Sequence, residues 1–174
     1  MFNEKSAKGL IRDINDYPKK GILFRDVTTL IGNPKAFNEC IDELASRLKG
    51  KRIDCIIGIE ARGFIIGSAL SYKMHAGFIP VRKKGRLPYK TISKRYSLEY
   101  GTDSIEMHSD AIKKGSSVLI ADDLLATGGT AKAAAELAEQ AEGKVAALAF
   151  LIELSALNGR DKLNGYDVIS LIKY

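Results

Sequence analysis

The sequence contains no tryptophan, only two cysteines and only two histidines, and these shortages limit the chemistry that it can carry. Cys40 and Cys55 lie in apolar segments, and neither has a cysteine or histidine neighbour at the close spacing of a metal site. We therefore expect both to be reduced residues that pack in the core. His75 and His108 also lack a partner at metal-ligand spacing, so we expect them to be packing or surface residues.

Long apolar runs and an export leader are missing as well. No run approaches the roughly 20 apolar residues that span a bilayer, and residues 1–21 contain no basic-then-apolar leader. A chain of 174 residues that is 45% hydrophobic and 28% charged has the size of one compact domain. We expect a single cytoplasmic domain over residues 1–174, with no membrane partner.

The net charge of +6 comes from one segment. Residues 82–95 hold seven of the 27 cations and no acid, which leaves 20 cations against 21 acids in the rest of the chain. A localised positive field of this kind suits a specific polyanion as well as it suits a nucleic-acid backbone. The charge alone does not decide between the two.

The pattern of apolar residues predicts an α/β fold with a mainly parallel sheet flanked by helices. A helix is expected from Pro34, which suits the first helical position, to about Leu48, with Gly50 after it. Short apolar runs typical of strands buried on both faces alternate with helical segments. The strands are expected at residues 53–59, 77–81, 117–121, 145–154 and 167–172, and further helices at residues 64–74 and 131–141.

Three other segments are less regular. Residues 10–14 suggest a short amphipathic helix, and residues 16–26 are expected to form a loop, because Pro18 and Gly21 interrupt them. Residues 96–100 and 104–108 are expected to pair as a hairpin.

The most informative segment is residues 122–130, because ligands of α/β sheets bind beyond the carboxyl ends of the strands. Its Thr-Gly-Gly-Thr turn leads into a helix, where free N–H groups, hydroxyls and the helix dipole suit one phosphate. The lysine of a nucleoside-triphosphatase loop is absent. Asp122 and Asp123 need a partner other than phosphate, and the vicinal hydroxyls of a sugar supply it. Ribose 5-phosphate satisfies the whole segment, although an ordinary strand-turn-helix is the alternative.

Residues 118–130 resemble the phosphoribosyl-diphosphate signature of the type I phosphoribosyltransferase family. Residues 21–26, 58–67, 81–88 and 96–108 are similar to segments of the members that use adenine, in the same order. The resemblance implies the family's fold, with a base-recognition segment at about 1–33 and a flexible hood, a loop and hairpin, at about 82–108. It also implies transfer of ribose 5-phosphate from 5-phosphoribosyl 1-diphosphate to N9 of adenine, and a homodimer. Mg²⁺ would be held mainly by diphosphate and water, with no direct protein ligand and no nucleic-acid partner.

The same resemblance assigns roles to individual residues. It places Asp122 and Asp123 at the ribose hydroxyls and the developing positive charge, and Glu99 at proton transfer near N7 of the base. Substrate-binding roles fall on the base-recognition segment, the diphosphate site, the hairpin and the 5-phosphate loop: Leu23, Phe24, Arg25, Arg62, Arg82, Arg86, Tyr100, Ala126, Thr127, Gly128, Gly129 and Thr130.

Other interpretations stay open at this point. Phe24 can be a core residue, Arg62 a surface partner of Glu60, Glu99 a water-facing glutamate and the basic segment a solvated loop. The chain can use another purine base. It can also be a regulator that senses phosphoribosyl diphosphate and binds nucleic acid through its cations and tyrosines.

Overall fold

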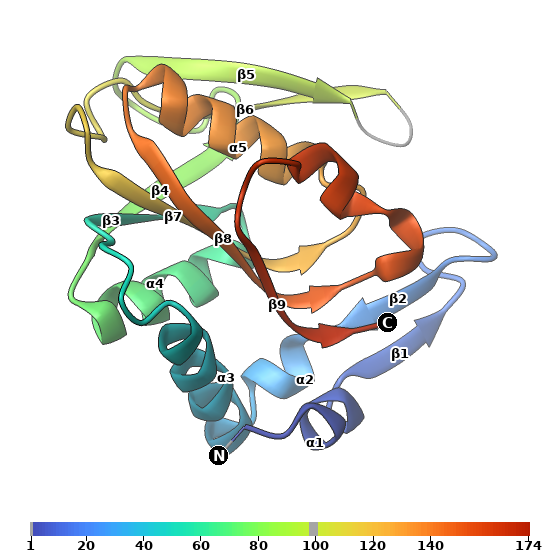
Figure 1. Ribbon diagram of the computed structural model, residues 1–174. Coiled ribbons are helices and arrows are strands. Elements are labelled where there is room, and N and C mark those ends of the chain that lie inside the picture. The colour runs from blue at the N-terminus through green and yellow to red at the C-terminus, as the bar shows by residue number, and fades with distance from the viewer. Residues whose placement is uncertain (1, 98–100) are drawn as a thin grey trace.

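The structure is a computed structural model that describes residues 2–97 and 101–174. Its described strands form a seven-stranded sheet in the order β5-β6-β4-β3-β7-β8-β9 and a separate two-stranded sheet of β1 and β2 (Figure 1). The strands are β1 (Arg12–Asn15), β2 (Leu23–Asp26), β3 (Cys55–Ile59), β4 (Gly77–Lys83), β5 (Thr91–Ser97), β6 (Thr102–His108), β7 (Ser117–Leu125), β8 (Lys144–Glu153) and β9 (Val168–Lys173).

Five strands of the large sheet, from β4 to β9 in that order, pair in parallel, whereas β6 and β5 add an antiparallel edge. The helices are α1 (Glu4–Gly9), α2 (Thr28–Ile31), α3 (Pro34–Arg47), α4 (Gly63–Met74) and α5 (Gly129–Gln140), with 3₁₀ turns η1 (Ser155–Leu157) and η2 (Gly159–Leu163). The α/β prediction is therefore confirmed. No helix of the described residues combines the length and the apolar character needed to cross a membrane.

The core has two layers because successive residues of a strand point to opposite faces of the sheet. Val118 and Ile120 of β7 lie in the layer under α5, and Leu119 and Ala121 lie in the layer under α3 and α4. This explains why the strand sequences are nearly all apolar. Figure 1 shows α5 on one side of the sheet and α3 and α4 on the other.

The amino-terminal predictions were wrong. The helix expected at residues 10–14 is replaced by α1, which ends at Gly9, and by strand β1. Part of the loop expected at residues 16–26 is strand β2, which pairs with β1 through Ile14 and Phe24. Strands of four residues are too short for a periodic pattern, and their partner across the turn is what stabilises them.

Strand β7 is longer than expected. It continues through Asp122 and Asp123 to Leu125, because β8 remains paired with it as far as the Leu125–Glu153 register. The two acids therefore lie on a strand of the sheet, and the turn of residues 126–130, here called the phosphate turn after the ligand expected from the sequence, begins only after them. A strand holds side chains more rigidly than the loop that the sequence suggested.

Helix α3 begins as predicted, with Pro34 in its first turn, and Asn33 caps it by accepting a hydrogen bond from the Ala36 N–H at 3.0 Å. We predict that Asn33→Ala lowers the free energy of unfolding by about 1 kcal/mol, because one helix N–H loses its acceptor. Urea unfolding followed by circular dichroism measures this loss. Lys35→Ala, an exposed change in the same helix, is the matched control, and equal stability of the two variants would contradict the prediction.

Candidate active site

The carboxyl ends of β3 and β7 lie side by side, since Gly58 pairs with Ala121, and they bring two chain segments into one cavity. The cavity has a volume of about 460 Å³. It is lined by Ile59, Glu60, Ala61, Arg62, Tyr96, Asp122, Asp123, Leu124, Ala126 and Thr130. The structure thus joins the residue 60–63 loop, the two acids and the phosphate turn.

Asp122 and Asp123 form the floor of this cavity. Burial raises the pKa of both carboxyls, and the charge of Asp123 raises the pKa of Asp122 further, whereas Arg62 opposes the rise in the pKa of Asp123. Arg62 Nε lies 2.7 Å from Asp123 Oδ2. That buried oxygen has no hydrogen-bond donor of acceptable geometry among the described residues. A site with two such acids favours a ligand that brings hydroxyl donors or positive charge.

The phosphate turn leads into helix α5 as predicted. Gly128 has a positive φ of 77°, which glycine adopts without strain, and α5 begins at Gly129. A small cavity of about 80 Å³ lies in this turn, lined by Asp122, Leu124, Leu125, Ala126, Thr127, Gly128, Gly129, Thr130 and Ala131. The first N–H groups of a helix have no partner in the helix itself, so this cavity presents donors to an anion.

Glu60 holds the basic segment at the edge of the larger cavity. Its Oε1 lies 3.1 Å from Arg82 Nη2 and 2.8 Å from Arg86 Nη1, and its Oε2 accepts from Arg82 Nε at 3.2 Å. Hydrogen bonding from Arg82 lowers the pKa of Glu60. The ion pair of Arg62 with Glu60 that the sequence left open is therefore wrong, because Glu60 binds Arg82 and Arg86 and Arg62 binds Asp123.

Glu106 fixes the turn that follows. It is 4% exposed, and its Oε1 accepts from the backbone N–H groups of Gly85, Arg86 and Leu87 at 3.0, 3.1 and 3.2 Å. Neither Glu60 nor Glu106 was predicted from the sequence to be a partner of the basic segment. Nothing in the strand pattern of residues 104–108 distinguishes an acid that binds a distant turn from one that faces water.

Phe24 of β2 lies next to Arg62, one of the residues that line the larger cavity. Its ring lies 5.4 Å from the Arg62 guanidinium and packs edge-to-face on Tyr17, with 5.2 Å between ring centroids. Phe24 is only partly buried and belongs to neither core layer, so the core interpretation of this residue is wrong. Leu23 is exposed, and Arg25 pairs with Asp13 and stacks over the ring of Tyr174.

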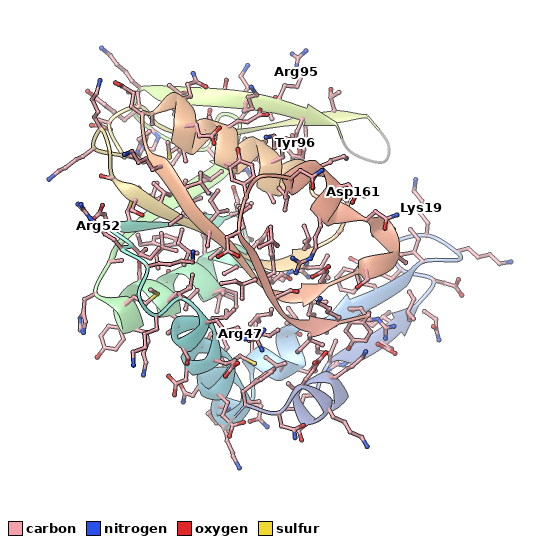
Figure 2. All side chains as sticks on the ribbon, in the orientation of Figure 1. Lys19, Arg47, Arg52, Arg95, Tyr96 and Asp161 are labelled. Atoms are coloured by element: carbon pink, nitrogen blue, oxygen red, sulfur yellow. The ribbon has the colours of Figure 1, made fainter. Side chains whose placement is uncertain are left out.

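The hairpin of β5 and β6 covers α5. Figure 2 shows Tyr96 on the side of β5 that faces α5 and Arg95 on the outer side. Tyr96 and Thr130 line the same cavity, and burial raises the pKa of the Tyr96 hydroxyl. The hairpin therefore borders the same cavity as the phosphate turn. The predicted roles of Glu99 and Tyr100 fall on residues outside the described part of the chain.

Comparison with known proteins identifies the family of the chain. Residues 28–173 match the family described as phosphoribosyl transferase domain. The adenine phosphoribosyltransferase of Brachyspira hyodysenteriae is 60% identical over 167 residues, which cover 96% of this chain and 98% of that protein.

Solved structures give the same result. The adenine phosphoribosyltransferase of Thermoanaerobacter pseudethanolicus has a TM-score of 0.96 at 52% identity, covering 99% of this chain and 100% of that one. The Saccharomyces cerevisiae enzyme, solved with adenine and an imino-altritol bisphosphate, has a TM-score of 0.91 at 40% identity, covering 97% of each chain. The chain therefore belongs to the phosphoribosyltransferase family, among its adenine phosphoribosyltransferases.

Proposed function

We propose that this protein transfers the 5-phosphoribosyl group of 5-phosphoribosyl 1-diphosphate to N9 of adenine, as a pentosyltransferase of purine salvage. The bond from C1 of the ribose to diphosphate breaks, the bond from C1 to N9 forms, and the imidazole ring of adenine loses its proton. The observation that carries the proposal is that the two carboxylates line the larger cavity together with Ala126 and Thr130, while the turn between these two residues forms the adjoining smaller cavity. The family membership supports the choice of base.

The ribose 5-phosphate portion matches the β7–α5 junction. The phosphate would accept hydrogen bonds from the N–H groups and hydroxyls of the turn, residues 126–130, and the ribose hydroxyls would donate to Asp122 and Asp123. As diphosphate leaves, positive charge develops on the ribose ring. The two carboxylates stabilise that charge most in the transition state, because they are fixed on a strand in a partly buried site.

The diphosphate would be held by Arg62, Arg82 and Arg86. The planar guanidinium of arginine suits phosphate oxygens, and the latter two are already gathered at the cavity edge by Glu60. An arriving diphosphate would compete with Glu60 for them. Closure of the basic segment, the hood, over the site would exclude water, which otherwise captures the ribosyl cation.

Base selection would fall to residues 23–25. Phe24 offers a ring for stacking beside Arg62, and backbone groups of Leu23 and Arg25 would read the amino group and N1 of adenine. Six-oxo purines reverse the donor and acceptor at these atoms and would leave buried polar groups unpaired. Glu99, with Tyr100 beside it, is our proposal for the group that handles the proton near N7.

The carboxylate pair also suits Mg²⁺ as a cofactor. The raised pKa values and the buried Asp123 oxygen without a hydrogen bond support a cation near these two acids. Magnesium bound with the diphosphate would neutralise charge on the leaving group. Asp122 and Asp123 would hold it through water molecules.

A homodimer in the cytoplasm completes the proposal. Large apolar side chains of α4 and β4 are exposed in the single chain: Ile65, Tyr72 and Phe78. Exposed apolar residues of this size mark protein interfaces when they gather on one surface. The phosphorylated substrate is a polyanion that does not cross a membrane unaided, which supports action inside the cell.

We predict that the purified protein releases diphosphate from phosphoribosyl diphosphate and Mg²⁺ when adenine is supplied. Hypoxanthine, guanine, xanthine and orotate, offered separately, should support turnover at least 10⁴-fold less well, as expected when buried polar groups lose their partners, roughly 10⁴ to 10⁵. Preference for another base would overturn the role of residues 23–25. Failure with all five bases, together with salt-resistant binding of random oligonucleotides, would favour the regulator.

Asp122→Asn should reduce turnover and stabilise the fold. The variant keeps an oxygen that can accept from the Asp123 N–H but loses the charge, so we expect kcat to fall about 10²- to 10³-fold. In the folded wild-type protein the pKa of Asp122 lies above the usual 3.8. The free energy of unfolding therefore falls as the pH rises from about 4 through the raised pKa, and this loss of stability persists at neutral pH.

Removing that ionisation should therefore raise the Tm at pH 7.5, by about 2–4 °C if about 1 kcal/mol is recovered. Scanning calorimetry and steady-state kinetics measure the two effects. Asp110→Asn, an exposed change of equal charge, is the matched control. Wild-type turnover in Asp122→Asn would remove this residue from the mechanism.

Glu99→Gln should lower kcat about 10²-fold while the KM for phosphoribosyl diphosphate stays within about twofold, because general acid–base groups act on the proton transfer alone. Steady-state kinetics over a range of both substrates separates the two constants. An unchanged kcat would leave Glu99 without a catalytic role.

A further inference from the structure

The backbone of Gly159 lies directly behind the phosphate turn. A Cβ added at Gly159 would overlap the carbonyl oxygen of Ala126, and a Cβ added at Gly128 would overlap the carbonyl oxygen of Gly159. In both cases the obstructing atom belongs to the backbone, which cannot turn away as a flexible side chain can. The two segments therefore touch with no room for a side chain between them, although some 30 residues separate them in sequence.

The next residue, Arg160, fastens this backbone to the sheet. Its Nε and Nη2 donate to the two carboxylate oxygens of Glu153 at 2.8 and 2.7 Å, and Nη2 also donates to Ser170 Oγ at 3.0 Å. Nη1 donates to the carbonyl oxygen of Val168 at 3.0 Å. Paired charged hydrogen bonds of this kind fix direction as well as distance.

The side-chain partners of Arg160 are buried, although the Arg160 side chain itself is 40% exposed. Glu153 lies at the carboxyl end of its strand, the end of the sheet where the site also lies. Glu153 and Ser170 are 6% and 5% exposed and lie on β8 and β9. Hydrogen bonding from Arg160 lowers the pKa of Glu153, so the carboxylate stays charged through the neutral range. Glu153 pairs in register with Leu125, the last residue of β7 before the turn. Arg160 and the turn therefore share one rigid support.

We propose that Arg160 is a positioning residue for the 5-phosphate. Through Gly159 it presses on Ala126 and Gly128 and keeps the N–H groups of residues 127–130 aimed at one point. A turn with two adjacent glycines has many accessible conformations, and an external support reduces them before the ligand arrives. The identity of the ligand rests on the proposed function, whereas the mechanical role of Arg160 does not.

Arg160→Gln tests the proposal. We expect the KM for phosphoribosyl diphosphate and the Kd for ribose 5-phosphate, measured by calorimetry, to rise about 10- to 100-fold, while the KM for adenine changes less than about twofold. Arg160→Lys keeps the charge but not the paired hydrogen bonds, so it should fall between Arg160→Gln and the wild type. Gly159→Ala should give the same pattern, because its methyl group displaces the turn. It replaces Arg160→Gln as the test if that variant folds poorly.

Arg47→Gln is the matched control. Arg47 of α3 also binds β9, with Nη1 donating to the Ser170 carbonyl oxygen at 3.2 Å. It lies on the other face of the sheet from η2, as the labels of Arg47 and of Asp161 in η2 show (Figure 2). The Arg47→Gln variant should be less stable than the wild type, with unchanged KM values for phosphoribosyl diphosphate and adenine. Amide hydrogen exchange without ligand should be faster over residues 126–130 in Arg160→Gln only.

The outcomes separate the two proposals. Equal exchange and equal ribose 5-phosphate affinity in the Arg160 and Arg47 variants would overturn the positioning role. If the wild-type protein itself fails to bind ribose 5-phosphate, the proposed function fails, and the exchange comparison still decides whether Arg160 positions the turn.

Discussion

Two successive carboxylates of β7, a half-buried Asp122 and a buried Asp123, determine how the rest of the site is built. Burial raises the pKa of each, so their ionised pair destabilises the folded protein. The surroundings are arranged to tolerate them. Gly63 begins α4 next to Asp122, where an added Cβ would lie 2.7 Å from Oδ1, and Arg62 pairs with Asp123. This destabilisation of the folded protein is found at the place where a bound sugar and cation would relieve it.

Three other acids near the site hold two different segments of the chain. Glu60 and Glu106 hold the basic segment on one side of the cavity, and the Glu153–Arg160 pair holds the phosphate turn from behind. All three acids have arginine or backbone N–H partners, whereas Oδ2 of Asp123 lies 2.7 Å from Arg62 Nε and has no hydrogen bond among the described residues. The unsatisfied charge of the site is therefore concentrated where the ribose is proposed to lie. Because these acids already have hydrogen-bond partners in the free protein, less of the site has to rearrange when the ligand binds.

The sequence predicted those parts of the molecule that are encoded by neighbouring residues. Helix α3, strand β3, helix α4 and the turn from Thr127 into α5 each depend on a local pattern of apolar residues, caps and glycines. The β1–β2 pair and the extension of β7 depend on partners elsewhere in the chain. The same is true of Glu106, whose carboxylate binds a turn about 20 residues away, and of Gly159. Local pattern does not contain such contacts, and only the resemblance to a known family pointed to Phe24.

If the turn after β7 binds the phosphate of ribose 5-phosphate, its amide signals should shift when that compound is added, and chemical-shift mapping measures this. We expect the largest changes at the amides of residues 126–130, with smaller ones at Asp122 and Asp123. A second open cavity of about 480 Å³, lined in part by Arg52, Lys113 and Lys114, lies at the amino ends of β3 and β7 and offers a competing cationic surface. Changes confined to that cavity, or none at the turn under saturating ligand, would contradict the account.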